Sequence, residues 1–74
     1  MKAVAIVSGW ISYTDETGER RLIPDGTRIR IESSANGYRV SWRDLNGRRR
    51  ATRWTDDDLK LHRSRALRSY LEAI

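Results

Sequence analysis

Arginine is the residue type whose abundance and spacing could do chemistry in this chain. Thirteen of its fifteen basic residues are arginines. Ten of these lie in residues 20–53, where only three acidic residues accompany them. An arginine presents five donors in a planar fork that matches phosphate and carboxylate groups. This clustering predicts a surface that meets a negatively charged partner, whereas a GC-rich genome would explain the preference for arginine but not the clustering.

The spacing of these arginines predicts that many of them share one face of a β-sheet. Apolar and polar residues alternate in 27–32 and again in 38–44, which is typical of strands with one buried face. Residues 48–54 are the next expected strand, with Trp54 turned inward. If the three strands are neighbours, six arginines lie on the outer face: Arg28, Arg30, Arg39, Arg43, Arg49 and Arg53.

Two readings of this face stay open. Like charges directly across strands repel each other, and a binding function explains their retention. Alternatively, the face is simply solvated, with the arginine stems covering the sheet. Arg48 and Arg50 belong to the same run as Arg49, and we expect them to clamp phosphate at the rim of the face if it binds nucleic acid.

The aromatic residues offer a second kind of contact. Tryptophan is more typical of a core than of a base-stacking platform, and Trp42 in particular alternates with buried positions. Tyr38 and Trp54 stand near strand ends, and they are the better candidates for stacking on bases.

No residue pattern indicates catalysis or a bound metal. The chain has no cysteine and a single histidine, His62, which excludes the usual zinc sites and catalytic triads. The consecutive carboxylates of residues 56–58 would point apart on a helix, so we expect them to cap it and not to hold Mg²⁺. We therefore expect a non-enzymatic protein with no catalytic residue, no metal and no cofactor.

The surrounding elements are expected to form one small domain over residues 1–74. The apolar run 3–7 predicts a buried strand that continues toward residue 13, and residues 20–23 predict a second strand. Thr55 is a suitable N-cap, and apolar residues at helical spacing predict a C-terminal helix over 56–73. The β-rich part then spans 2–54, and the fold class is a β-rich α+β domain.

Two predicted hairpins share one pattern. The spacing Tyr13-x-Asp15-x-x-Gly18-x-Arg20-Arg21 recurs as Trp42-x-Asp44-x-x-Gly47-x-Arg49-Arg50. Aspartate at the first turn position bonds its own backbone, and glycine accepts a positive φ, so both segments predict tight hairpins. Common turn chemistry explains the match more simply than duplication does.

The stretch GYRVSWRDLNGRRRATRW, followed by a helix with an acidic cap, is similar to the arm-type N-terminal DNA-binding domains of phage and transposon integrases. With TRIRIE included, the resemblance covers residues 27–71. It implies a three-stranded antiparallel sheet that packs on a C-terminal helix and enters the major groove. It also implies that the six arginines of the outer face contact DNA.

The rhythm LIPDGTRIRI…GYRVSWRDLNGRRRATRWTDDDL is also similar to small SH3-like barrels, with a strand, a loop and then a tight distal hairpin. This second resemblance accommodates the strand at residues 3–7. The expected architecture is thus an antiparallel sheet of four or five strands, or an SH3-like partly open barrel, with one C-terminal helix.

The leading functional hypothesis is a small nucleic-acid-binding protein, of phage or mobile-element type, that prefers DNA to RNA. The alternative is an SH3-like interaction module, or a phage-type inhibitor or adaptor, that grips an acidic protein surface. A structural subunit of a larger assembly is a third reading. The N-terminal apolar run is too short for a signal peptide or a membrane span, which favours a cytoplasmic protein without a membrane partner. The oligomeric state stays open.

Overall fold

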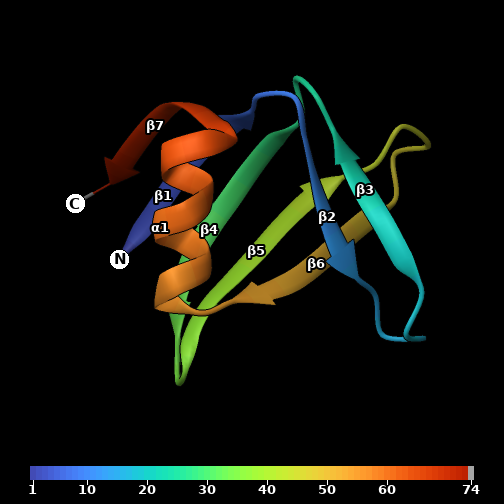
Figure 1. The fold of residues 1–74 in the computed structure, drawn as a ribbon, viewed down its shortest axis with the longest axis horizontal. Coiled ribbons are helices and arrows are strands. Elements are labelled where there is room, and N and C mark those ends of the chain that lie inside the picture. Colours follow the sequence, from blue (N-terminus) through green and yellow to red (C-terminus); the bar gives the residue numbers. More distant parts are fainter. Residues whose placement is uncertain (74) are drawn as a thin grey trace.

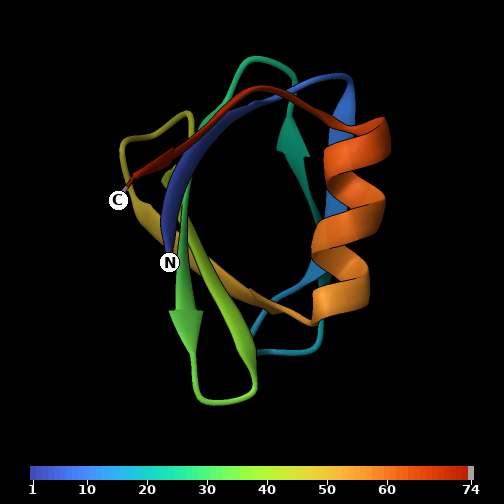
Figure 2. The same ribbon diagram turned by 90° about the vertical axis from the view of Figure 1, so that its left-hand side faces the viewer.

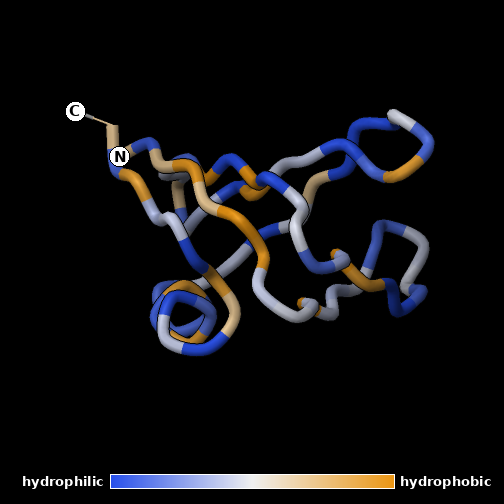
Figure 3. The backbone as a smooth tube through the Cα atoms, turned by 90° about the horizontal axis from the view of Figure 1, so that it is seen from above, coloured by the Kyte–Doolittle hydropathy of each residue, from blue (hydrophilic) through white to orange (hydrophobic). Residues whose placement is uncertain are grey.

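The computed structural model describes residues 1–73 and places them in two layers that enclose one core (Figures 1 and 2). One layer is a five-stranded antiparallel sheet with the spatial order β6 (Arg49–Trp54), β5 (Gly37–Arg43), β4 (Arg28–Ser34), β1 (Lys2–Val7) and β7 (Leu67–Ala73). The other layer holds a separate ribbon, β2 (Trp10–Thr14) and β3 (Arg20–Pro24), and the helix α1 (Asp56–Arg65). Seen end-on from above, α1 lies on one side of the sheet (Figure 3). The expected β-rich fold with an antiparallel sheet and a single helix is confirmed.

The core is built from the inward positions of alternating strands. Ile29 and Ile31 of β4 and Val40 of β5 are fully buried, and the residues between them point outward. The alternation that the sequence predicts for these strands is therefore confirmed. The remaining buried apolar side chains come from both layers: Ala3, Ala5, Val7, Ile11, Tyr13, Ile23, Trp42, Trp54, Leu59 and Ala66.

The ribbon is a strand pair of its own and not an extension of β1. The backbone breaks at Gly9, whose φ of 87° is in the left-handed region that favours glycine. From there β2 crosses to the second layer and pairs with β3 in register from Trp10↔Pro24 to Thr14↔Arg20. Ile11, Tyr13 and Ile23 then cover the sheet from the inside.

The helix is shorter than the sequence predicts. A helix over 56–73 is expected, but α1 ends at Arg65. Its start agrees with the prediction, because Thr55 and Asp58 form a reciprocal capping box with bonds of 3.1 and 2.9 Å. Only Leu59 of α1 is buried, so the helix has too narrow an apolar stripe to hold another two turns against the core.

Residues 67–73 instead form β7, which pairs antiparallel with the free side of β1. Backbone pairing satisfies the hydrogen-bonding groups of an apolar strand that would otherwise be a sheet edge. A bulge between Val4 and Ile6 adjusts the register, and Ser69 adopts a positive φ of 53° there. The guanidinium of Arg63 covers the ring of Tyr70 at 4.0 Å and ties α1 to the new strand.

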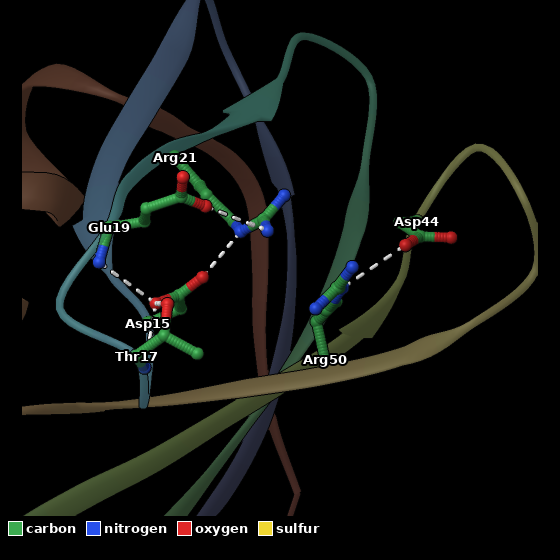
Figure 4. Close-up of polar contacts among 6 residues, drawn as sticks. All are labelled: Asp15, Thr17, Glu19, Arg21, Asp44 and Arg50. Carbon is green, nitrogen blue, oxygen red and sulfur yellow. Dashed lines mark hydrogen bonds and ion pairs between the residues drawn. The ribbon is translucent and has the colours of Figure 1, made fainter.

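The turn between β2 and β3 is organised by a nearly buried carboxylate (Figure 4). Asp15 Oδ1 accepts hydrogen bonds from the backbone N–H groups of Thr17 and Glu19 at 2.9 and 3.0 Å. Its other oxygen, Oδ2, accepts from Arg21 Nε at 2.5 Å. The hydrogen bonds from Thr17, and after them the one from Arg21, hold the pKa of Asp15 well below its usual range.

The turn between β5 and β6 repeats this chemistry (Figure 4). Asp44 Oδ1 accepts from the N–H groups of Asn46 and Arg48, both at 2.9 Å, and Oδ2 accepts from Arg50 Nε at 3.1 Å. Burial alone would raise the pKa of Asp44, but the bonds from Arg48 and Arg50 outweigh it and lower the pKa. The predicted similarity of the two hairpins thus extends to the arginine six residues after each aspartate.

The two hairpins also meet in the core. The rings of Tyr13 and Trp42, which hold equivalent places in the two patterns, pack edge to face with their centroids 4.9 Å apart. This contact joins the β2–β3 ribbon to the five-stranded sheet.

We expect Asp15→Asn to flatten the dependence of stability on pH. Because the pKa of Asp15 is depressed in the folded chain, its contribution is complete above the ordinary carboxyl pKa and is lost progressively as the pH falls from about 5 toward the depressed folded pKa. Urea denaturation at pH values in this window measures the free energy of unfolding. The variant should be less stable than the parent at neutral pH and should lose less on acidification.

Asp44→Asn is the matched control for this experiment, since its pKa is depressed less strongly. An equal flattening in both variants would contradict the dominant role of Asp15. Burial also lowers the pKa of His62. Because the ordinary pKa of histidine is about 6.5, the effect of His62 on stability occurs at a higher pH than that of Asp15, and the two effects can be separated.

Gly37→Ala tests the close approach between the β4–β5 turn and the end of β6. Gly37 has a φ of 141°, and a Cβ atom there would overlap the carbonyl oxygen of Trp54. The clash and the strained backbone together should lower the free energy of unfolding by about 3 kcal/mol. In Gly47→Ala, where the added Cβ meets open space at a φ of 78°, only backbone strain of about 1 kcal/mol is expected. Equal losses in the two variants would refute the close approach.

Candidate functional site

Strand register brings six arginines onto the outer face of the sheet. The strands β4, β5 and β6 are neighbours, as the sequence analysis requires. In them, the residues that alternate with the buried core positions point away from α1 and the ribbon. All six predicted arginines hold such positions and are exposed: Arg28, Arg30, Arg39, Arg43, Arg49 and Arg53. We call this set the arginine face.

The arginine face has a regular internal layout. At one end Arg39 is directly opposite Arg53, and at the other end Arg43 is directly opposite Arg49. The two ends are four positions apart along each strand, a distance of about 13 Å. The small pair Ser41 and Ala51 lies between them. The face therefore consists of two cationic ridges with a low saddle, and Arg30 flanks the saddle opposite Ser41.

These guanidinium groups have few partners inside the protein. Arg43 Nη1 donates to the carbonyl oxygen of Gly47 at 2.9 Å, and Arg53 Nη2 donates to Ser34 Oγ at 3.2 Å. Within residues 1–73, no carboxylate lies close enough to any of the six to form an ion pair. Glu32, the one acidic residue on these strands, is half-buried opposite Arg39. Most of the donor capacity of the face is thus directed at solvent.

A shallow groove of about 740 Å³ runs over this surface. Five of the six arginines line it, and it continues between the loop 24–27 and the turn that carries Leu45. Leu45 is 92 % exposed, so this turn projects freely at one end of the groove.

The two remaining arginines of the run differ in position. Arg48 lies in the turn and is exposed at the end of the face, as expected. Arg50 lies opposite Trp42 on the inward side of β6, where it pairs with Asp44 and both side chains are 22 % exposed. The turn aspartate thus holds the guanidinium of Arg50 on the inward side, although Arg50 also lines the groove over the arginine face.

The aromatic candidates lie on the other side of the sheet. Trp54 is only 4 % exposed, and its ring packs against His62 at 4.5 Å, so the prediction that it offers a stacking surface is wrong. Tyr38 is half-buried and also packs against the core; the nearby Asp56 carboxylate, together with burial, raises its pKa. Trp42 is buried as expected, but Trp10 is 63 % exposed.

The apolar run before Trp10 predicts one continuous buried strand, so the exposure of Trp10 differs from that expectation. The available signal is alternation itself. The buried positions are odd-numbered before Gly9 (Ala3, Ala5, Val7) and after it (Ile11, Tyr13), so Trp10 falls among the exposed positions.

The arginine face ends in an apolar border at β1 and β7. Val4 and Ile6 of β1 point outward beside Arg30 and Arg28, and Val4 is opposite Leu71 of β7. Leu71 is 67 % exposed. Beyond this border, β1 and β7 add the exposed cations Lys2, opposite Glu32, and Arg68, opposite Ile6.

The part of the chain that the structure describes holds no cluster of three or more side chains suited to bind a metal ion. None of its helices combines the length and the apolar character that crossing a membrane would need. Comparison with protein-family models, with curated proteins and with solved structures finds no match to this chain.

The opposed arginines should reduce stability in the free protein. Arg49→Thr removes the repulsion from Arg43, so the free energy of unfolding should rise by about 0.2–1 kcal/mol at low salt. The gain should shrink in high salt, because ions screen exposed charges. Arg30→Thr, whose cross-strand neighbours are Val4 and Ser41, is the control and should show a smaller change. A clear loss of stability in Arg49→Thr at low salt would contradict this account.

Proposed function

We propose that the chain is a small, non-enzymatic nucleic-acid-binding domain whose arginine face binds phosphate groups. The observation that carries the proposal is the set of six exposed arginines on three adjacent strands, without ion pairs in residues 1–73. Four of the six form two directly opposed like-charge pairs. A polyanion relieves the repulsion that this arrangement creates. Each planar guanidinium can also bind a phosphate in bidentate fashion.

The layout of the face supports contact with a nucleic-acid backbone. Its two ridges are about 13 Å apart, and the saddle of Ser41 and Ala51 leaves room between them. No aromatic ring of β4, β5 or β6 projects from this face, since Tyr38, Trp42 and Trp54 all point inward. This favours recognition of phosphates over stacking on unpaired bases.

We propose DNA as the preferred partner. The major groove of B-DNA is about 12 Å wide and admits a β-ribbon, whereas the deep, narrow major groove of A-form RNA does not admit side chains. The three antiparallel strands β4, β5 and β6, followed by α1, support the proposed likeness to arm-type integrase domains. The succession of β1, the β2–β3 excursion and the tight β5–β6 hairpin supports the proposed likeness to SH3-like barrels. A phage or mobile-element origin and a cytoplasmic site of action belong to the same proposal.

Salt dependence tests the proposal directly. With about four phosphates contacted, the affinity for random-sequence duplex DNA should fall roughly 100-fold between about 50 and about 200 mM salt. Fluorescence anisotropy with a labelled duplex measures this slope. The variant Arg39→Glu/Arg43→Glu, with one reversal on each ridge, should lose at least about tenfold in affinity at the lower salt concentration.

The matched control is Lys60→Glu/Arg65→Glu, which changes the net charge equally on exposed residues of α1. It should stay close to the parent protein in affinity. An equal loss in both variants would indicate only diffuse attraction and would contradict a defined face. No binding by the parent at low salt would reject nucleic acid and favour an acidic protein partner. Tighter binding to duplex RNA than to DNA would reject the DNA preference.

A further inference from the structure

A second exposed surface lies on the layer opposite the arginine face. Trp10 and Leu22 are 63 % and 60 % exposed on the outer side of the β2–β3 ribbon. Trp10 is opposite Pro24, and Leu22 is opposite Ser12, so the two large side chains are diagonal neighbours on one face. The other two tryptophans are at most 6 % exposed. One of the three tryptophans therefore lies outside the core of this small fold.

The backbone that presents Trp10 is held firmly. The N–H group of Gly9 donates to Asp25 Oδ1 at 2.8 Å, and Arg68 Nη1 lies 3.7 Å from the same oxygen. The N–H group of Ser8 donates to the carbonyl oxygen of Ala66 at 2.8 Å. These hydrogen bonds fix the backbone at the start of β2, where Trp10 lies. A large aromatic ring on a rigid backbone loses little conformational freedom when a partner covers it.

One cation flanks this pair of apolar side chains. Arg20 is exposed, and its Nη2 donates to Ser12 Oγ at 3.1 Å, which places the guanidinium beside Leu22. No carboxylate in the described chain forms an ion pair with it. Its neighbour Arg21, in contrast, pairs with Asp15. We call the set Trp10, Leu22 and Arg20 the ribbon patch.

We propose that the ribbon patch docks a short segment of a partner protein that carries an apolar side chain next to a carboxylate. Tryptophan and arginine are the residue types most enriched among those that dominate binding energy at protein interfaces. The carboxylate would pair with Arg20, and the apolar group would cover Trp10 and Leu22. The docking proposal does not depend on nucleic-acid binding.

The size and charge of the ribbon patch favour a short peptide segment over a second copy of the chain or a nucleic acid. Its two large side chains expose about 250 Å², whereas a stable pair of copies needs about 800 Å² from each partner. Copies with a net charge of +5 also repel one another. A single flanking cation is a weak attractor for a nucleic-acid backbone compared with the six of the arginine face. A short acidic and apolar segment satisfies all three constraints.

The experiment selects random twelve-residue peptides displayed on phage against the parent protein, after depletion on the variant Trp10→Ser/Leu22→Ser. We expect enriched sequences to place Asp or Glu beside a large apolar residue. As synthetic peptides, they should bind the parent at least tenfold more tightly than the depletion variant. They should also shift the Trp10 indole resonance in NMR spectra.

Two further variants locate the interaction. Leu71→Ser, which removes a comparably exposed side chain from the other layer, should leave the affinity unchanged. Arg20→Ser should weaken binding by several-fold without affecting the folded spectrum. Far-ultraviolet circular dichroism of the depletion variant checks that it remains folded, which is expected because both of its changes are at exposed positions.

Four results would overturn the proposal. The first is that no peptide binds the parent more tightly than the depletion variant. The second is that the enriched peptides contain no acidic residues. The third is a dimer of the parent in sedimentation that Trp10→Ser abolishes, which would assign the patch to a second copy. The fourth is a shift of the Trp10 indole by single-stranded oligothymidine that exceeds the shift caused by the peptides, which would assign the patch to nucleobases.

Discussion

The strict alternation of β4 and β5 is the constraint on which the rest of the structure depends. Ile29, Ile31 and Val40 are completely buried, and their strand neighbours Arg28, Arg30 and Arg39 are exposed. A shift of either strand by one residue would exchange the two sets and bury the arginines. The core therefore fixes the arginine face, because no register that exposes the apolar residues competes with it. A dense set of like charges is held in place by packing on the reverse side of the same strands.

The paired arginines that follow the two turns have divided roles. In each hairpin the second arginine, Arg21 or Arg50, binds the aspartate of its own turn. The first, Arg20 or Arg49, faces outward and is left for other contacts. The turn aspartate thus pairs with one arginine of each Arg-Arg pair, and the other arginine stays exposed. The same short pattern therefore supplies Arg49 to the arginine face and Arg20 to the ribbon patch.

Most of the arginine face could be predicted from sequence, because a period of two depends only on local order. The strands 27–32, 38–44 and 48–54 and their outward arginines follow from it directly. The end of α1 could not be predicted in this way. The segment 67–73 has apolar residues compatible with a helix, and its pairing with β1, more than sixty residues away in the chain, decides its structure. The exposure of Trp10, in contrast, follows from the same period of two, since the buried positions are odd-numbered on both sides of Gly9.

A domain of 74 residues has little stability to give up, so the placement of its unfavourable groups is informative. The sheet tolerates two directly opposed arginine pairs, and the ribbon tolerates an exposed tryptophan and leucine. Neither feature improves the isolated fold, because the first adds repulsion and the second leaves apolar surface in water. They also lie on opposite layers, so a ligand on one does not block the other. The two proposed ligands, a polyanion on the arginine face and a protein segment on the ribbon patch, are therefore compatible with each other.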